Sequence, residues 1–508
     1  MDDRRLLSSS SPRARSQGVL AALGLLVASS FLCLRARSKT IPQGGVALGA
    51  ISSDDAKSGV TVVAGAAAGS LVLLRNAAKQ TTPRFVVVAR SSSDVEEAVR
   101  YARRERLRVT VLATGHDYDG RSCGADTLNI NTHQMRWARF VGPDLMSVGP
   151  GTPWMDVIEA ALEAGMAPVA GYDASVGVSG FTLGGGHGPL SRQHGLGADH
   201  LVAATVVGAD GIARAADDRL LRALRGGGGG TFGIVTELVI RVVPAPKQVT
   251  QLGFKNAPVD EAFMDRFFHN ATWWKLLPPA WAGWKNLWCK DGVPRATGVY
   301  LYTGDDPNPL DLESMRDLYP ALKDYARVDA FPSLLHFAKH LGSSPLGSHA
   351  RQSIANVFVE TIHPNLTDLV LKAACDATED LTIFYNDVLG GDVIKNPPYP
   401  SAVATGFRDA LFEVGANVFW TNPRDDAANV QASYEANKPL VDIAPASYLN
   451  EWTSHPRHLR VDDWFSRFYG GKENYDALLR VKTEIDPCNM FWVRHGVGSD
   501  QPSFFDRC

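Results

Sequence analysis

The stretch GYDASVGVSGFTLGGGHGPLSRQHGLGADH, residues 171–200, decides the fold. Six glycines fall within twelve of its residues, interleaved with small hydroxyl side chains and Val176. A structural loop rarely needs so many glycines, and because glycine has no Cβ the run favours a backbone wrapped around a large flat cofactor that carries phosphates. His187, His194 and His200 lie in the same stretch without a matching carboxylate or cysteine cluster, so the sequence predicts no metal site.

A second glycine loop, LATGHDYDG at residues 112–120, holds the lone histidine His116. The strand-like run LRVTVLA (107–113) leads into this loop. Before it come the strand-like stretch FVVVA and a helix that is predicted to start with a capping box of Ser93 and Glu96. These segments predict a βαβ unit with His116 just past its second strand. On the residues alone, His116 could be a turn residue, a metal ligand, a catalytic base or a point of cofactor attachment.

A third glycine run contains a G-x-G-x-x-G pattern at Gly228, Gly230 and Gly233. A dinucleotide-binding fingerprint needs a strand before the pattern and a helix after it. Here the helical stretch DRLLRALR (218–225) precedes the pattern and the strand-like stretch IVTELVIRVV (234–243) follows it. The order is reversed, so the fingerprint is rejected. The glycines suit instead a close approach of backbone amides to an anionic or planar ligand.

The composition is that of an ordinary globular protein of 508 residues, with 45% hydrophobic and 21% charged residues. The formal net charge of −3 gives no reason to expect a nucleic acid partner, which calls for a basic face. Four arginines precede an uncharged apolar run at residues 18–34, which resembles a signal peptide or a short signal anchor. No A-x-A cleavage site follows the run. The missing cleavage site favours an uncleaved anchor, so we expect a protein of the secretory pathway that is membrane-anchored or secreted.

Two N-x-[ST] sequons, at Asn270 and Asn365, suit that location. The six cysteines are far apart in the sequence and form no C-x-x-C pair, which makes a zinc site unlikely and allows one or two disulfides. The middle of the chain, residues 246–430, carries no motif of known chemistry.

Within the middle region, WWKLLPPAWAGWKNLW contains five of the eleven tryptophans. Pro278 and Pro279 predict the start of a helix that would place Trp281, Trp284 and Trp288 on one face. That face could be a packed core stripe or a wall on which a substrate stacks.

Four motifs taken together resemble the berberine bridge enzyme-like oxidases, which are part of the wider vanillyl-alcohol-oxidase type of FAD-binding proteins. They are ATGHDYDGRS, SVGVSGFTLGGGHGPLSRQHGLGAD, RGGGGGTFGIVT and the late SYLNE followed by YDALLRVKTEIDP. The resemblance runs in order from about residue 81 to the C-terminus and is weakest over 246–430.

The resemblance implies an α+β fold. A two-subdomain FAD-binding domain of the PCMH type would cover residues 81–245, after a targeting or anchor segment and linker at 1–57. An α+β substrate domain with an antiparallel sheet covered by helices would cover 246–430. Residues 431–508 would complete the FAD and substrate site. The expected cofactor is FAD, the expected partners are a small-molecule substrate and O2, and we expect a monomer.

In the family, the histidine of the first glycine loop bonds covalently to the 8α-methyl group of the flavin, and His116 occupies that place. Many relatives add a cysteine bond from the second loop, where this chain has Asp173, so a single covalent bond is expected. The resemblance implies further FAD-binding residues in all three glycine runs: Ala113, Thr114, Gly115, Asp117, Ser175, Val176, Gly177, Gly180, Gly184, Gly186, His187, Gly233 and Ile234.

The late motif matches the family's Y-x-N pattern at Tyr448 and Asn450, which position or deprotonate the substrate hydroxyl in relatives. Plant relatives often have a tyrosine after the asparagine, whereas this chain has Glu451. That carboxylate could be the general base, if burial raises its pKa, or a surface residue. Val176 falls at the family's oxygen gate, where valine leaves room for O2. The sequence therefore predicts an oxidase that forms H2O2.

Two other functions stay open on the sequence. One is an FAD dehydrogenase that uses an acceptor other than oxygen, and the other is a catalytically degenerate, membrane-tethered flavoprotein. The substrate is not specified either, because family members oxidise sugars, monolignol-type alcohols, alkaloids and polyketide-derived rings.

Overall fold

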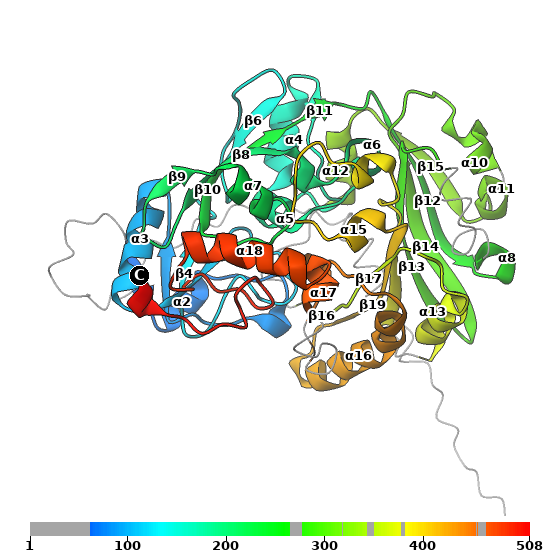
Figure 1. The fold of residues 1–508 in the computed structure, drawn as a ribbon. Coiled ribbons are helices and arrows are strands. Elements are labelled where there is room, and N and C mark those ends of the chain that lie inside the picture. The colour runs from blue at the N-terminus through cyan, green and yellow to red at the C-terminus, as the bar shows by residue number, and fades with distance from the viewer. Residues whose placement is uncertain are drawn as a thin grey trace, which may run out of the picture.

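A computed structural model describes residues 61–264, 277–316, 318–342, 350–376, 381–453, 455 and 464–508. Within these residues the strands form three larger sheets and one two-stranded ladder, with helices between and over them. In Figure 1 the N-terminal sheets, blue to green, lie on one side of the molecule, and the largest sheet lies on the other. The predicted α+β fold class is confirmed.

The first sheet is mostly parallel, with the strand order β1-β2-β4-β3. Its strands are β1 (Val62–Ala64), β2 (Phe85–Val88), β4 (Thr127–Asn131) and β3 (Arg108–Leu112). The helix α3 (Ser92–Arg104) connects β2 to β3 and buries Val95, Ala98, Val99 and Ala102. The βαβ unit predicted around His116 is therefore present, and β1 extends the sheet to residues before 81.

The predicted capping box of α3 is displaced by two residues. Ser91 is the N-cap, and its side chain and that of Asp94 make the reciprocal bonds. Glu96, predicted as the second member, instead accepts a hydrogen bond of 2.7 Å from the backbone N–H of Ala213. Ser91 has the extended backbone that an N-cap needs, whereas Ser93 lies inside the helix.

The second sheet is antiparallel, with the order β5-β6-β10-β8-β9. Its strands are β5 (Ala138–Phe140), β6 (Leu145–Val148), β10 (Ile234–Arg241), β8 (Leu201–Val207) and β9 (Ala213–Ala215). The helix α7 (Asp218–Leu224) precedes the third glycine run and β10 follows it, which is the order predicted from the sequence. Nearby lie α4 (Trp154–Leu162), α5 (Val178–Gly184), α6 (Ser191–His194), the 3-10 turn η2 (Gly197–His200) and the ladder of β7 (Met166–Ala167) with β11 (Val243–Pro244).

The third sheet is antiparallel and has the order β15-β12-β14-β13-β18-β19-β16, with β17 also paired to β19. Its strands are β12 (Val249–Pro258), β13 (Trp281–Lys290), β14 (Val293–Tyr302), β15 (Ala326–Phe331), β16 (Arg351–Ser353), β17 (Val357–Val359), β18 (Leu381–Asn386) and β19 (Phe412–Trp420). The helices α13 (Leu366–Cys375) and α16 (Asp426–Ile443) pack on one face of it. Side chains on that face, such as Ile383, Val414 and Val418, are buried.

The tryptophan-rich stretch is a strand, so the predicted helix is wrong. Trp281 starts β13, which pairs along its length with β14. Successive strand residues point to opposite faces, so Trp281 and Trp284 cannot share a side. Trp281 is fully buried in the core, and Trp284 lines a cavity on the other face. The packed-core interpretation therefore holds for Trp281, and Trp284 is the tryptophan that lies at the cavity.

Short helices and turns complete the fold. They are α2 (Ala66–Ser70), η1 (Ala77–Lys79), α8 (Glu261–Met264), η4 (Pro309–Asp311), α10 (Glu313–Arg316), α11 (Leu318–Leu322), α12 (Leu334–Leu341), α14 (Asp392–Lys395), α15 (Thr405–Asp409), η5 (Pro423–Asp425), η6 (Leu449–Glu451), α17 (Trp464–Tyr469), α18 (Lys472–Ile485) and η7 (Phe505–Arg507).

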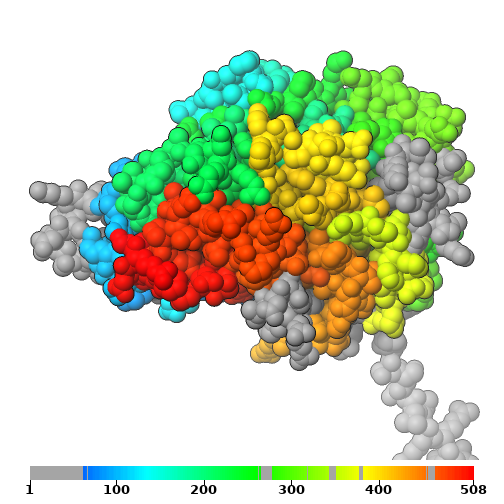
Figure 2. Space-filling view, viewed as in Figure 1, coloured from blue at the N-terminus to red at the C-terminus, as the bar shows by residue number. Residues whose placement is uncertain are grey.

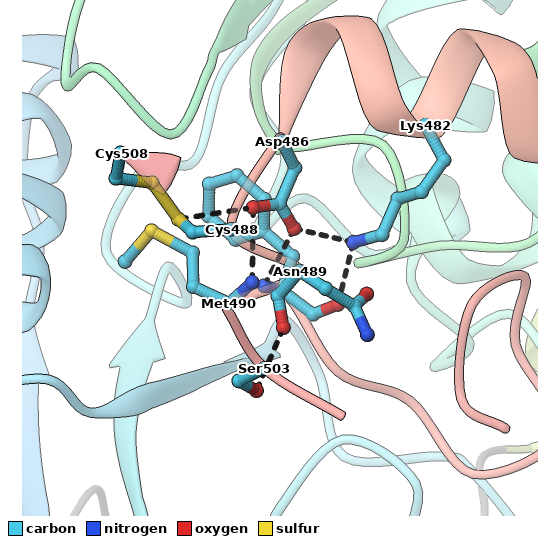
Figure 3. Close-up of a disulfide and its surroundings, with 8 residues drawn as sticks. Lys482, Asp486, Cys488, Asn489, Met490, Ser503 and Cys508 are labelled. Carbon is cyan, nitrogen blue, oxygen red and sulfur yellow. Dashed lines mark hydrogen bonds and ion pairs between the residues drawn. A yellow bond between two sulfur atoms is a disulfide. The ribbon is translucent and has the colours of Figure 1, made fainter. Parts of the chain in front are cut away.

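The C-terminal segment returns to the first sheet. The helix α18 packs beside α7, as the red and green surfaces of Figure 2 show. After it the backbone of Phe491 bridges to Val109 on β3. The disulfide Cys488–Cys508 closes this segment, and the buried carboxylate of Asp486 holds its turn (Figure 3). A second disulfide, Cys289–Cys375, joins β13 to α13.

Some features singled out from the sequence lie outside the described residues, near the N-terminus and in the middle of the chain. The apolar run at 18–34, Cys33 and the sequon at Asn270 lie outside the described residues. The other sequon, Asn365, is exposed at the start of α13. Among the described helices, none combines the length and hydropathy needed to cross a membrane.

Candidate active site

A cavity of about 1000 Å³ lies where the glycine loops face the third sheet. Its wall contains the His116 loop, the second glycine loop, part of the third glycine run, and the η6 turn. The strands β13, β18 and β19 contribute the opposite wall. We call this wall the inner face, and its side chains are Trp284, Asn286, Phe384, Asn386, Asn417 and Phe419.

His116 sits on a tight turn that only glycine can make. Gly115 has a φ of +79°, and a Cβ there would lie 2.1 Å from the carbonyl oxygen of Leu73. Burial is the main cause that lowers the pKa of His116, to about 4, so the ring is neutral at physiological pH. Its Nδ1 atom is buried and has no hydrogen-bond partner among the described residues. The histidine loop therefore places a neutral imidazole in the cavity wall, and one nitrogen of that ring has no partner among the described residues.

The other nitrogen of His116 is held by the second glycine loop. Its Nε2 atom lies 2.9 Å from the hydroxyl oxygen of Ser175. That hydroxyl donates to the carboxylate of Asp173 at 2.6 Å, and the Ser175 backbone N–H donates to the same oxygen at 2.9 Å. Asp173 stands where the family's second flavin-binding cysteine is expected, and here it supports the histidine through a serine.

An arginine and a tyrosine, Arg75 and Tyr118, line the cavity beside the His116 loop. The Arg75 guanidinium lies 3.9 Å from Asp173 and 5.3 Å from the ring centre of Tyr118, whose hydroxyl it also contacts. Burial raises the pKa of Tyr118 to about 12, so this phenol is neutral. Asp117, predicted to bind the cofactor, pairs with Arg121 and accepts the backbone N–H of Asp119, so it shapes the loop while lining the cavity.

The predicted cofactor residues divide into three groups. Ser175, Gly184 and Gly186 do not line the cavity and instead contact His116, Asn450 and Tyr448. Those that line the cavity are Ala113, Thr114, Gly115, His116, Asp117, Val176, Gly177, Gly180 and His187. In the third glycine run, Gly228, Gly229, Gly230 and Thr231 line it too. Gly233 and Ile234 instead lie behind this wall, because Gly233 packs against Val206 and Ile234 begins the buried strand β10. The strand pairing draws these two residues into the core.

The Y-x-N motif is anchored to the second glycine loop. The Tyr448 hydroxyl accepts hydrogen bonds from the backbone N–H of Gly186 at 3.0 Å and from the Asn450 amide at 2.9 Å. The same amide donates to the carbonyl of Gly180 at 2.9 Å. A Cβ on Gly184 would lie 2.3 Å from the Asn450 amide nitrogen. The loop glycines Gly180, Gly184 and Gly186 therefore make room for, and hold, Asn450 and Tyr448.

Glu451 lies at the cavity and not on an outer surface. Its side chain is 22% exposed, and it faces the fully buried Glu413 of β19 and the imidazole of His187. The Nε2 atom of His187 lies 3.4 Å from Glu413 and 3.5 Å from Glu451. The prediction that no carboxylates accompany His187 is wrong, because these three side chains bring ligand atoms within 4.8 Å of one another.

Proton positions favour a shared proton over a metal at this cluster. The Asn386 amide donates to His187 Nδ1 at 3.3 Å, which leaves the N–H of His187 at Nε2, facing both carboxylates. The Asn356 amide donates to Glu451 at 3.0 Å. In this tautomer the Nε2 atom of His187 offers an N–H group to the two carboxylates and has no lone pair to offer a cation.

The electrostatics of Glu413 and Glu451, which we call the carboxylate pair, follow from burial. Burial and the charge of Glu451 raise the pKa of Glu413 well above its usual range. Burial raises the pKa of Glu451 to about 7. Two neighbouring buried carboxylates resist double ionisation, so the pair carries one proton near neutrality. Its ionised member can act as a general base.

Sequence reasoning missed Glu413, Asn386 and Asn356. All three lie in the region of the chain without motifs. A signal was present in FEVGANVFW, residues 412–420, where the buried Val414, Ala416 and Val418 alternate with polar positions. Read as a strand of period two, this pattern places Glu413 and Asn417 on one face.

Comparisons with known proteins agree with this site. Residues 83–216 match the family described as FAD binding domain, and residues 437–498 match the one described as Berberine and berberine like. The FAD-linked oxidoreductase ZEB1 of Gibberella zeae is 36% identical over 459 residues, which cover 82% of this chain and 76% of that protein. The chain belongs to the berberine bridge enzyme-like FAD-linked oxidoreductases. It is an FAD-dependent enzyme, and the resemblance inferred from the sequence is confirmed.

Other relatives extend the match. The VAO-type flavoprotein oxidase VAO615 of Thermothelomyces thermophilus is 29% identical over 456 residues, 82% of this enzyme and 76% of the relative. The crystal structure of aclacinomycin oxidoreductase has the same fold, with a TM-score of 0.72 at 22% identity over 85% of this chain and 98% of that one. The predicted PCMH-type fold is confirmed.

The residues around the cavity fit FAD. The Nδ1 atom of His116 is a buried polar group without a hydrogen-bond partner among the described residues, and a covalent bond to a flavin methyl carbon would use its lone pair. The backbone of Gly228, Gly229 and Gly230 offers a surface without side chains to a planar or anionic group.

Proposed function

We propose that this enzyme carries FAD covalently on His116, oxidises an alcohol-type or cyclic small molecule of no net charge, and passes the electrons to O2 to form H2O2. The observation that carries the proposal is that one cavity contains both the His116 ring, which has an unpartnered nitrogen, and Glu451 of the carboxylate pair beside Tyr448. Bound FAD supplies the chemistry of accepting two electrons with a hydrogen from a carbon atom and of passing the electrons to O2.

The protein's own contribution is to take a proton and to fix the substrate. Glu451 accepts the proton of the substrate hydroxyl. The two described partners of the Tyr448 hydroxyl both donate to it, so its own O–H is left to donate into the cavity. Glu413 keeps a proton next to Glu451, and Nε2 of His187 lies 3.4 Å from Glu413 and 3.5 Å from Glu451. The substrate hydroxyl therefore meets a base and a donor on one side of the site.

The inner face supports the substrate class. It alternates aromatic with carboxamide side chains across paired strands: Trp284 pairs with Asn386, and Asn286 pairs with Phe384. None of the four is charged. Aromatic rings stack on apolar faces, and amides bond to hydroxyl or carbonyl groups. This surface suits a neutral ring that carries oxygen substituents, such as a sugar or an aromatic alcohol.

Val176 supports oxygen as the acceptor. It lines the cavity next to Gly177, and its side chain is smaller than that of leucine, so it leaves more space in the cavity. The relative from Thermothelomyces thermophilus is named an oxidase, which favours the same choice. A dehydrogenase that uses another acceptor is the second candidate.

Oxygen uptake tests the proposal. The purified enzyme is screened in an oxygen electrode against panels of neutral sugars and aromatic alcohols, and H2O2 is measured at the end. We expect uptake with at least one ring alcohol. Flavin that is reduced by a substrate but stays reduced for minutes in air would make the enzyme a dehydrogenase.

We also propose that the protein enters the secretory pathway, because of the apolar run at 18–34 and the exposed sequon at Asn365. Endoglycosidase treatment of the protein from its native host should lower its mass. An unglycosylated cytosolic protein would contradict this, and the size of the mature N-terminus would distinguish a cleaved signal from an anchor.

A further inference from the structure

We propose that Asp173 and Ser175 form a proton relay that makes His116 a nucleophile for its own attachment to FAD. The relay rests on the covalent tether proposed above and explains how this chain forms it. It assigns a chemical task to Asp173, the residue that replaces the second cysteine.

The hydrogen bonds fix which nitrogen of His116 holds the proton. Ser175 has one hydroxyl hydrogen, and it donates that hydrogen to the Asp173 carboxylate at 2.6 Å. The Ser175 oxygen, 2.9 Å from His116 Nε2, must then accept. Nε2 therefore carries the hydrogen, and Nδ1 has a free lone pair.

The free lone pair has no competing partner. Nδ1 finds no hydrogen-bond partner among the described residues and belongs to a side chain that lines the cavity. The nitrogen itself is buried, so the ring must turn toward the cavity to react. Burial lowers the pKa of His116 to about 4, so protonation does not block the lone pair at neutral pH. A neutral imidazole nitrogen of this kind is a competent nucleophile.

Attachment then needs a base for the second nitrogen. The lone pair of Nδ1 forms a bond to the 8α-carbon of FAD, which gives up one hydrogen as a proton. Two electrons pass to the flavin ring, and O2 takes them up with two protons as H2O2. The imidazole would be left cationic unless Nε2 loses its proton. The Nε2 proton passes to the Ser175 oxygen while the Ser175 hydroxyl proton passes to Asp173. The overall reaction converts FAD, histidine and O2 to histidyl-FAD and H2O2.

Asp173 is suited to receive and release this proton. Its side chain is 23% exposed, so the proton can leave to solvent. The Arg75 guanidinium lies 3.9 Å from this carboxylate. The arrangement resembles the logic of catalytic triads, in which a carboxylate sets the tautomer of a histidine.

The test follows covalent loading and not turnover. Full-length protein is expressed with limiting riboflavin and incubated with FAD in air-saturated buffer. At intervals the flavin that stays on the protein after acid precipitation is measured, with its mass on the peptide that contains His116. Loss of a general base is worth about a hundredfold or more, so Ser175→Ala and Asp173→Asn should load at least tenfold more slowly while they still bind FAD reversibly.

Two variants separate the relay from a loss of structure, one by keeping the hydroxyl and one by keeping the shape of the carboxylate. Ser175→Thr keeps the hydroxyl and should load at close to the wild-type rate. Asp173→Asn keeps an oxygen that can accept both bonds from Ser175 but cannot take up the proton, so it tests the relay even if Ser175→Ala fails to fold. Wild-type loading rates in Asp173→Asn would overturn the relay and leave the tether standing. A wild type that releases all its flavin in acid would overturn the proposed tether itself, and the relay with it.

Discussion

At the scale of single residues, the two members of the carboxylate pair have different roles. Glu451 is the more exposed of the two, and its pKa is raised to about 7, whereas Glu413 is fully buried and its pKa is raised well above its usual range. We expect Glu451→Gln to slow flavin reduction by substrate by about a hundredfold. Glu413→Gln mimics the protonated partner and should slow it only a few-fold. Anaerobic stopped-flow mixing measures both, and the opposite ranking would make Glu413 the base.

The same pair predicts the pH dependence of the wild type. A general base must be ionised, so the rate of flavin reduction should be full above the pKa of Glu451, about 7, and should fall as the pH drops below it. The tyrosines Tyr118 and Tyr448 have raised pKa values and stay neutral across this range. A reduction rate that is flat between pH 5 and 8 would contradict the assignment.

The sequence motifs predicted His116 as the residue that attaches the flavin, but they did not predict Glu413 as the partner of Glu451. The His116 loop and the Y-x-N motif were recognised because both are compact motifs within one loop. Glu413 was missed because it acts together with His187, 226 positions earlier in the chain, and only the folded sheet brings the two side chains together. Val176 belongs to this scale as well: Val176→Leu adds one methylene at the cavity and should slow reoxidation by O2 while reduction stays near normal.

At the scale of elements, the alternation of apolar and polar residues predicts the strands of the third sheet better than the prolines predict a helix. Pro278 and Pro279 suggested a helix, but Trp281 to Lys290 pair with β14 and β18 and become a strand whose faces divide the tryptophans between core and cavity. Long-range pairing overrides local propensity here, and a sequence window cannot show it. By contrast, α3, α7 and β10 were predicted correctly because their apolar spacing is regular and their ends carry caps or glycines.

The C-terminal end of α5 gives a prediction at this scale. Gly184 ends the helix against Asn450, and a methyl group there would lie 2.3 Å from the amide nitrogen. We expect Gly184→Ala to displace Asn450 and, through it, Tyr448, so that flavin reduction slows by tenfold or more. Covalent flavin on His116 should be retained, because that loop is a separate element. Loss of the covalent flavin in this variant would show that the helix end also shapes the cofactor site.

At the scale of the whole molecule, the last residues of the chain fasten the strand that carries the His116 loop. The backbone of Val109 on β3 donates to Met490 at 2.7 Å and accepts from Trp492 at 3.0 Å. Asp486 accepts the backbone N–H groups of Met490 and Phe491, each at 2.9 Å. The disulfide Cys488–Cys508 closes this segment over 20 positions (Figure 3). Such a loop closure is worth about 3 kcal/mol.

Removal of each disulfide should therefore have different consequences. Cys508→Ser frees the segment that pairs with β3, so we expect a lower unfolding midpoint together with a lower fraction of covalently bound flavin. Cys375→Ser opens the Cys289–Cys375 link between β13 and α13, which span 86 positions on the substrate side. It should lower the midpoint as much or more, because the longer loop is worth between 4 and 5 kcal/mol by the same relation, at about 300 K. Its flavin content should stay at the wild-type level. Thermal unfolding and acid-stable flavin are measured on both variants, and equal flavin loss in the two would mean that general destabilisation, and not the fastening of β3, controls attachment at His116.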